Sequence, residues 1–304
     1  GGNITAPGEG SFDYLESDVV NIVAVSDSNY HFSHWSGDNA TIANPVAAST
    51  TVTMSANYSI IASFVNTPPV LASGSVTPTT GFKATSFIYS VNYADAENTP
   101  PQSPYVSIDG GANIQMTAAD GGDTDYTDGK IYTYTTSGLA KGTHTYQFSA
   151  SDGVSSATGD NATHSGPTVA NTPPTQPVVS VAPATPYTTD DLVCTVTTPS
   201  TDVDDGDTVT YTYAWYKNNV LQAGLTINTV PSANTTKGEA WKCTVTPGDG
   251  TDNGTAHTSN QITVLNTAPT LTGVTITPDP AWSGSDLTAT PNGWYDADSD
   301  PAGY

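Results

Sequence analysis

Apolar and polar residues alternate along several short stretches of the chain, and the clearest of them is 191–197. A period of two predicts a half-buried strand, because successive side chains of a strand point to opposite faces. The same pattern returns in 209–216, which contains Trp215, and in 240–246, which contains Cys243. No window has apolar residues at helical spacing, and Val, Thr, Tyr and Ile dominate the periodic segments. The pattern predicts an all-β chain of short strands joined by turns.

A proline-containing motif divides the chain. Asn66-Thr67-Pro68-Pro69 returns as Asn171-Thr172-Pro173-Pro174 and, with one change, as Asn266-Thr267-Ala268-Pro269. Each copy follows an apolar strand and precedes another, so we interpret the copies as stiff linkers. Their spacing of about 100 residues matches one immunoglobulin-like domain. The predicted domains are 1–65, 66–170, 171–265 and 266–304.

The domains after the first linker repeat one plan. Thr85–Val91 takes the place of the strand that contains Cys194, and Gly142–Ala150 takes the place of the strand that contains Cys243. A further copy begins in 266–304 with the strand 287–290 and then stops. About forty residues cannot close a sandwich, so we expect this last domain to be incomplete or to be completed by strands from elsewhere.

The net charge of the chain excludes one class of partner. Six basic and 29 acidic residues give a formal net charge of −23, which repels a phosphate backbone and excludes nucleic acid as a partner. The sequence has no run of about 18 apolar residues, so it predicts no membrane-spanning helix, and it shows no signal-peptide pattern. Because the sequence starts with Gly1-Gly2 and not with Met, we expect a processed product or a segment of a longer protein. Bound divalent cations would lower the repulsion among so many negative charges.

The acidic residues gather in one loop of each repeat, and a second acidic turn follows in two of them. Aspartates spaced by two can bring alternate side chains to one centre, as the oxygen ligands of Ca²⁺ require. Magnesium is disfavoured, because its octahedral geometry seldom suits an all-protein cage. The alternative is that these are solvated loops in which Asp hydrogen-bonds its own backbone. The candidate ligands are Asp95, Glu97, Asp152, Asp202, Asp204, Asp207, Asp249, Asp296, Asp298 and Asp300.

The first domain has a distinct sequence. The segments Gly1–Gly10, Tyr30–Asp38 and Tyr58–Phe64 resemble the divergent internalin-B repeat of bacterial and archaeal surface proteins. This resemblance implies a small, β-grasp-like module. Its core would contain Phe32, Trp35 and Phe64. A first strand before the double glycine is usual in such repeats, so we expect an upstream piece.

The linkers, the acidic loops and the order Cys194, Trp215, Cys243 resemble tandem immunoglobulin-like domains of large microbial cell-surface proteins, over residues 66–304. The resemblance implies a disulfide between Cys194 and Cys243 that joins two sheets across the indole. The alternative is that both cysteines are buried free thiols. A zinc site is disfavoured, because two cysteines alone do not supply enough ligands. The resemblance also implies that the acidic loops and the linkers meet at one end of each sandwich. Bound Ca²⁺ would then stiffen the joints between domains.

Other candidate sites are weaker. The five histidines are scattered without zinc spacing, and the carboxylates lie in repeated turns and not around a nucleophile. We therefore expect no enzymatic activity. Roughly five Asn-x-Ser/Thr sequons would arise by chance in such a composition, so their number alone does not establish glycosylation. The sequon asparagines are Asn3, Asn39, Asn57, Asn161, Asn234 and Asn253.

These observations favour a structural or adhesive segment of an extracellular surface protein, such as a stalk, sheath or filament subunit with calcium-stiffened joints. A disulfide with a Thr-rich surface suits an oxidising exterior. The expected partners are other copies of the chain, other surface proteins or glycans. The alternative is an accessory carbohydrate-binding region of a secreted polysaccharide-active enzyme, since an aromatic face stacks on a sugar ring.

Overall fold

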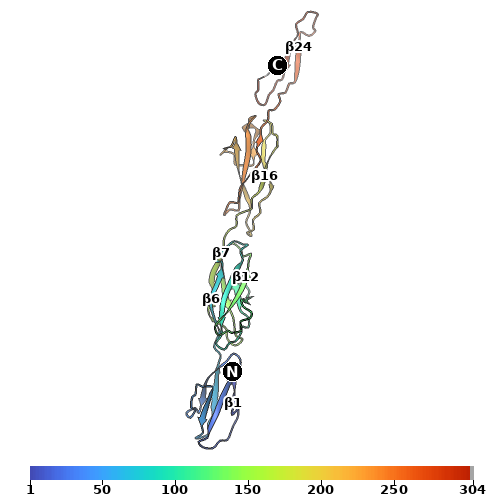
Figure 1. Ribbon diagram of the computed structural model, residues 1–304. Helices are drawn as coiled ribbons and strands as arrows, with labels where there is room; N and C mark the ends of the chain where they lie inside the picture. The colour runs from blue at the N-terminus through green and yellow to red at the C-terminus, as the bar shows by residue number, and fades with distance from the viewer. Residues whose placement is uncertain (302–304) are drawn as a thin grey trace. The chain divides into compact units, whose positions relative to one another are not determined.

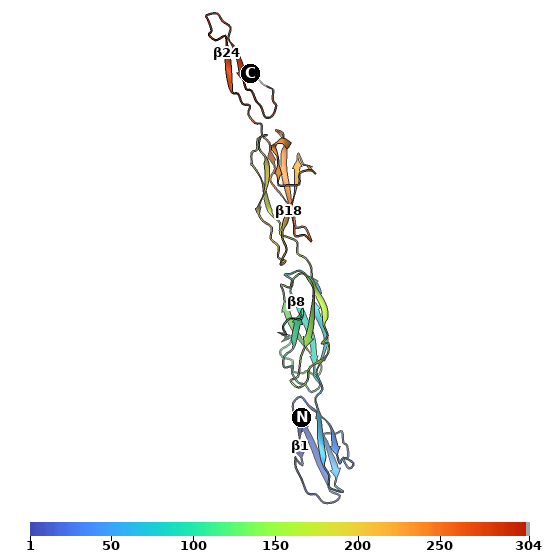
Figure 2. The ribbon, with the colours of Figure 1, turned by 180° about the vertical axis from the view of Figure 1, so that it is seen from behind.

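The structure, a computed structural model, describes residues 1–301 (Figure 1). It contains two compact units, Gly1–Ala170 and a second that begins at Asn171. Their described residues form β-strands, with a single short 3₁₀ helix at Ser232–Asn234. The predicted all-β class is therefore confirmed. Figure 2 shows the same strands from behind.

The N-terminal domain is built from two small antiparallel sheets. Trp35 is 1% exposed at its centre, and its indole Nε1 donates to Ala47 O at 2.9 Å. Phe32 packs on Trp35 and on Phe64, with ring centroids 5.3 and 5.9 Å apart, so the predicted core is confirmed. One sheet has the order β1 (Gly2–Ala6), β2 (Val19–Ser26) and β4 (Ser49–Thr53), and the other pairs β3 (His31–Gly37) with β5 (Ile60–Val65).

The second domain is a sandwich of two five-stranded sheets. Strand β8 shows why it folds: Phe87, Tyr89, Val91 and Tyr93 alternate along it, and each is at most 1% exposed. One sheet has the order β10 (Ile114–Gln115), β9 (Tyr105–Ile108), β13 (Gly142–Ser149), β15 (His164–Val169) and β7 (Thr80–Gly81). The other has the order β11 (Thr117–Ala118), β12 (Lys130–Thr136), β8 (Phe87–Ala94), β6 (Val70–Thr77) and β14 (Thr158–Gly159).

The third domain is a second immunoglobulin-like sandwich. Trp215 is fully buried between the sheets, lies opposite Cys243 in the strand register, and meets Trp241 edge to face at 6.3 Å. One sheet has the order β16 (Val178–Ala182), β17 (Leu192–Thr198) and β20 (Thr229–Val230). The other has the order β19 (Val220–Leu221), β18 (Thr210–Lys217), β21 (Ala240–Gly248) and β22 (His257–Thr258), with β23 (Ile262–Thr263) also paired to β21.

The two cysteines lie where a bridge between sheets would be. Cys194 is on β17 and Cys243 on β21, both are buried, and their thiols interact directly. The structure nevertheless has both as free cysteines, so it does not contain the disulfide, which stays a prediction. Interaction with Cys194, together with burial, raises the pKa of the Cys243 thiol.

After the third linker the chain forms only a hairpin, in which β24 (Gly273–Thr277) pairs with β25 (Thr288–Asn292). No residue from 265 to 301 is buried, and Trp282 is 77% exposed. A lone hairpin has no second layer to cover its apolar face. The described residues after the third linker therefore form one hairpin and no sandwich.

Candidate metal centres

Each acidic loop follows the corresponding strand of its domain, β8, β17 or β25. In all three, the first acidic side chain accepts a hydrogen bond from the backbone N–H two residues later. This Asx turn fixes one carboxylate oxygen and leaves the other available. The bonds are Glu97 N to Asp95 Oδ1 (3.0 Å), Asp204 N to Asp202 Oδ1 (2.8 Å) and Asp298 N to Asp296 Oδ1 (2.8 Å).

The linker closes on the second acidic residue of each loop in the same way. The threonine N–H of the Asn-Thr-Pro motif, or of its Asn-Thr-Ala copy, donates to that carboxylate. The three bonds are Thr67 N to Glu97 Oε1 (3.3 Å), Thr172 N to Asp204 Oδ2 (2.6 Å) and Thr267 N to Asp298 Oδ2 (2.7 Å). Linker and loop therefore form one recurring unit.

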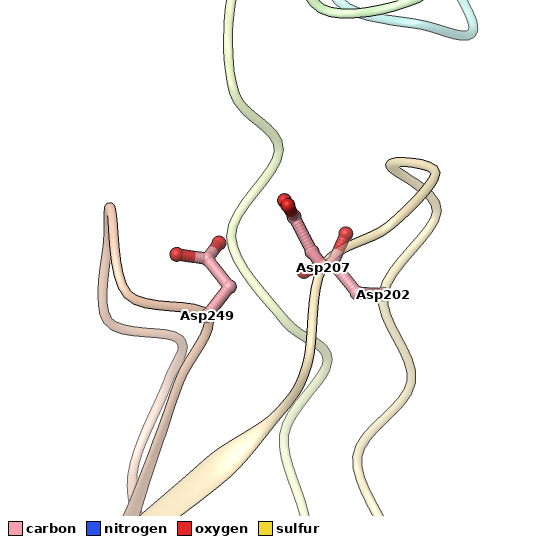
Figure 3. Close-up of side chains that lie close together, drawn as sticks. All are labelled: Asp202, Asp207 and Asp249. Carbon is pink, nitrogen blue, oxygen red and sulfur yellow. The ribbon is translucent and has the colours of Figure 1, made fainter.

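The central loop and the turn after β21 together gather three carboxylates. Ligand oxygens of Asp202, Asp207 and Asp249 all lie within 4.8 Å of one another. Figure 3 shows Asp249 approaching from the turn after β21, while Asp202 and Asp207 come from the loop between β17 and β18. The expected meeting of these two turns is what the structure shows. Oxygen atoms at this separation suit the ligand set of a hard cation.

Asp204 adds a second observation at the same place. It is only 4% exposed, and its Oδ1 has no hydrogen-bond partner among the described residues. Oδ2 of Asp202 is likewise buried and without a hydrogen bond. A buried carboxylate oxygen that lacks a donor is costly, and a bound cation would remove that cost.

Asp249 is held in place from two sides. Its Oδ1 accepts the N–H groups of Thr251 (2.6 Å) and Asp252 (2.8 Å). The Asn171 amide, at the start of the linker, donates to Asp249 Oδ2 and to Asp252 Oδ2, each at 2.9 Å. The linker thus contacts both turns that supply the carboxylates.

The third loop gathers Asp296, Asp298 and Asp300 within 4.8 Å, and Oδ1 of Asp298 is buried without a hydrogen bond. A positively charged side chain lies beside this loop. Lys237 of the third domain pairs with Asp300 and donates to Asn266 Oδ1 at 3.1 Å. The hydrogen bond to Asp300 raises the pKa of Lys237, so the ammonium partly neutralises this loop.

The first loop is different. The predicted ligands Asp95, Glu97 and Asp152 do not form a group of three carboxylates within 4.8 Å in the described residues. The position that Asp300 occupies in the third loop is taken by Thr99, whose N–H donates to Asp95 Oδ1 at 3.0 Å. Asp95 Oδ2 and Glu97 Oε2 remain buried without a hydrogen bond, so two potential ligand atoms persist.

The N-terminal domain contacts this first loop and the neighbouring Asp152 turn. His31 pairs with Glu97, and Asn29 Nδ2 donates to Asp152 O at 2.9 Å. Asn66 Nδ2 donates to Asp152 Oδ2 at 2.7 Å. Burial raises the pKa of Asp152, but hydrogen bonds from Ser155 and Asn66 outweigh that effect and hold the pKa below its ordinary value. Sequence reasoning missed Asn29 and His31, because no local pattern shows that their turn contacts this loop.

The six sequon asparagines, Asn3, Asn39, Asn57, Asn161, Asn234 and Asn253, are all exposed. Their glycosylation stays a prediction. Within residues 1–301, no helix has the length and apolar character needed to cross a membrane.

Three solved structures show what the chain is similar to. Three consecutive domains of titin share 8% identity and cover 87% of this chain and 97% of their own, with a TM-score of 0.26. Domains 4–9 of surface layer protein SbsC share 16% identity and cover 87% of this chain and 45% of their own, with a TM-score of 0.23. The N-terminal eight Ig domains of Down Syndrome Cell Adhesion Molecule (DSCAM) share 12% identity and cover 91% and 37%, with a TM-score of 0.25.

Structural similarity at TM-scores this low gives no information about function. The chain also spans less than half the length of the last two structures. No curated protein matches the chain. Residues 1–68 match the family model described as divergent InlB B-repeat domain, which agrees with the resemblance of that segment. The chain therefore carries a divergent InlB B-repeat domain at its N-terminus, followed by tandem immunoglobulin-like sandwiches.

Proposed function

We propose that this chain is a structural, non-enzymatic segment of an extracellular surface protein, in which Ca²⁺ locks the linkers onto the sandwiches. The observation that carries the proposal is the central loop. Three carboxylates converge there, two buried oxygens lack donors, and the linker residues Asn171 and Thr172 bond to the same loops. The composition, the tandem β-domains and the surface-protein repeat at the N-terminus support an extracellular role.

The electrostatics explain why an ion would act as a lock. Two unit charges 4.8 Å apart repel by about 3 kcal/mol at an effective dielectric constant of about 20. Without a cation, this repulsion pushes the turns after β17 and β21 apart. With Ca²⁺ bound, the same carboxylates attract a common centre and hold the linker donors in place. Calcium suits this irregular set of oxygens better than Mg²⁺ does.

The proposed extracellular location has consequences for the two cysteines, the sequons and the partners of the chain. In an oxidising exterior, Cys194 and Cys243 would close to a disulfide from their present position, and exposed sequon asparagines would accept glycans. Other copies of the chain, other surface proteins or glycans are the proposed partners. A stalk, a sheath or a filament subunit would each use β-domains on stiff linkers.

Calorimetric titration of the chelator-treated full chain with Ca²⁺ tests the proposal. We expect saturable binding that the triple variant D202N/D207N/D249N weakens more than 100-fold. The matched control is D120N/D125N/D128N, which changes three exposed aspartates of one loop that are not gathered within 4.8 Å of one another. Equal titrations for the wild type and the triple variant would remove the basis of the proposal.

A further inference from the structure

The N-terminal domain contains a cavity of about 960 Å³ that the proposed structural role does not use. Its lining includes Ile22, Trp35 and Val52, which are 5%, 1% and 2% exposed and belong to the core. Sites for small ligands have volumes of roughly 300–1,000 Å³. These core side chains lie at the base of the cavity, and more exposed residues surround them.

The loop between β1 and β2 forms another wall of the cavity. It carries Phe12, Tyr14 and Leu15, whose side chains are 46%, 38% and 77% exposed although all three line the cavity. Its C-terminal end is fixed, because Ser17 N donates to Met54 O at 2.7 Å and Met54 N donates to Asp18 O at 2.9 Å. Apolar side chains that converge on an opening mark a contact surface for a partner.

The acidic residues around this opening favour a basic partner. Glu9, Asp13 and Glu16 line the same cavity, and no Lys or Arg is among its lining residues. Complementary charge is what distinguishes the right partner from wrong ones at such a surface. A second copy of this chain, with a formal net charge of −23, is a poor occupant.

The neighbouring strand indicates an extended ligand. Ile60, Ile61 and Ala62 are consecutive residues of β5, and all line the cavity. Within residues 1–301, β5 pairs only with β3, so one edge of β5 has no strand partner. Unpaired strand edges bind extended peptides through main-chain hydrogen bonds, while adjacent pockets accept alternate side chains.

We propose that this cavity binds an extended segment of another protein in which apolar side chains alternate with Lys or Arg. The apolar side chains enter between Trp35 and the loop residues Phe12 and Leu15. The basic side chains pair with Glu9, Asp13 and Glu16. The N-terminal domain is then a recognition module, independent of any ion bound by the later domains.

Fluorescence anisotropy with labelled peptides of roughly ten residues tests this on the full chain. The probe alternates Val and Lys. One control peptide replaces Lys by Glu, and a second replaces Val by Ser. We expect the Val/Lys peptide to bind at least tenfold more tightly than either control. Equal affinity for the Val/Lys and Ser/Lys peptides would show simple charge attraction and would overturn the proposal.

Variants locate the binding. We expect F12A/L15S to weaken the Val/Lys peptide at least tenfold, and E9Q/D13N/E16Q to weaken it at least fivefold and to reduce its salt dependence. The control is I131S, which removes a half-exposed apolar side chain from β12 in the second domain. All these changes lie at exposed positions, and unchanged melting curves would show that the variants are folded. Unaltered affinity in F12A/L15S, or self-association of the chain through this face, would contradict the proposal.

Discussion

The first and the central acidic loops begin with the same contacts and differ in the groups that lie around their carboxylates. Both place a linker threonine N–H on the second carboxylate and both hold their first Asp in an Asx turn. The first loop has Thr99 four residues after its first Asp, where the third loop has Asp300. His31 of the preceding domain pairs with its Glu97, and Asn29 accepts a hydrogen bond from Thr99 Oγ1, while the central loop and the Asp249 turn bring three carboxylates toward one another.

We interpret this difference as two solutions to one electrostatic problem, with protein groups at the first loop and the proposed cation at the central loop. Like charges near a linker are tolerable when protein donors surround them, or when a cation sits among them. The third loop lies between the two cases, since it has three carboxylates and also Lys237. We therefore expect Ca²⁺ affinity to be highest at the central loop.

Loss of one carboxylate from the central group should give the largest effect. We expect D207T to weaken Ca²⁺ binding at the central loop about 100-fold, because the group of three loses one anionic ligand. T99D, which gives the first loop the aspartate that the third loop has at Asp300, should strengthen binding at the first loop. Titration calorimetry of each variant measures both effects. If D207T binds as the wild type does, the comparison between the loops fails.

Calcium should also stabilise the domains unequally. At a free concentration 100 times the dissociation constant, a ligand stabilises the folded state by about 2.7 kcal/mol. We expect this gain in the unfolding of the third domain, followed by its buried Trp215 and Trp241, and a smaller gain in the second domain. Denaturant unfolding with Ca²⁺ and with chelator gives the two values. Equal stabilisation of both domains would argue against selective binding at the central loop.

The protein donors of the first loop should matter without any ion. Glu97 has a side chain only 3% exposed and pairs with the half-exposed His31. We expect H31A to cost about 1–2 kcal/mol of folding free energy, because it leaves a buried carboxylate with fewer partners. H34A, an exposed histidine on the same strand, is the matched control. The loss should be the same in Ca²⁺ and in chelator, and a loss that Ca²⁺ cancels would mean that an ion replaces His31.

The smallest effect concerns pH in the second domain. Burial lowers the pKa of His144, but hydrogen bonds to Asp109 and Ala140 O outweigh it, so the pKa is raised above 6.5. A raised folded-state pKa stabilises the domain fully below the unfolded pKa of about 6.5 and loses that contribution as pH rises through the folded value. We expect H144Q to remove this slope between pH 6 and 8, roughly the titration range of histidine. A slope that persists in H144Q would assign it to another group.

Much of the fold is predictable from the sequence. Alternation fixed the strand with Cys194 to within one residue, 191–197 against the observed Leu192–Thr198, because burial on one face leaves a period of two. The strand with Cys243 runs on to Gly248, two residues past its prediction, where Pro247 is still buried. A local apolar pattern cannot show where a ladder of hydrogen bonds ends.

The candidate sites are less predictable. The spacing of two identified Asp202 together with Asp204, and the domain plan placed the Asp249 turn beside their loop, but the group of three is completed by Asp207, which lies outside that spacing. The contacts of Glu97 with His31 and of Asp152 with Asn29 join residues far apart in the sequence. The same holds for the cavity beneath Phe12 and Leu15, since a loop without periodicity gives no signal of what it covers.

Small-angle X-ray scattering of the full chain, with saturating Ca²⁺ and then with chelator, tests the central claim most directly. If a cation locks the linkers, scattering in Ca²⁺ should fit one rigid conformation, and chelator should produce a distribution of conformations that D202N/D207N/D249N shows even with Ca²⁺ present. Identical scattering curves for the wild-type chain in both conditions would contradict the account.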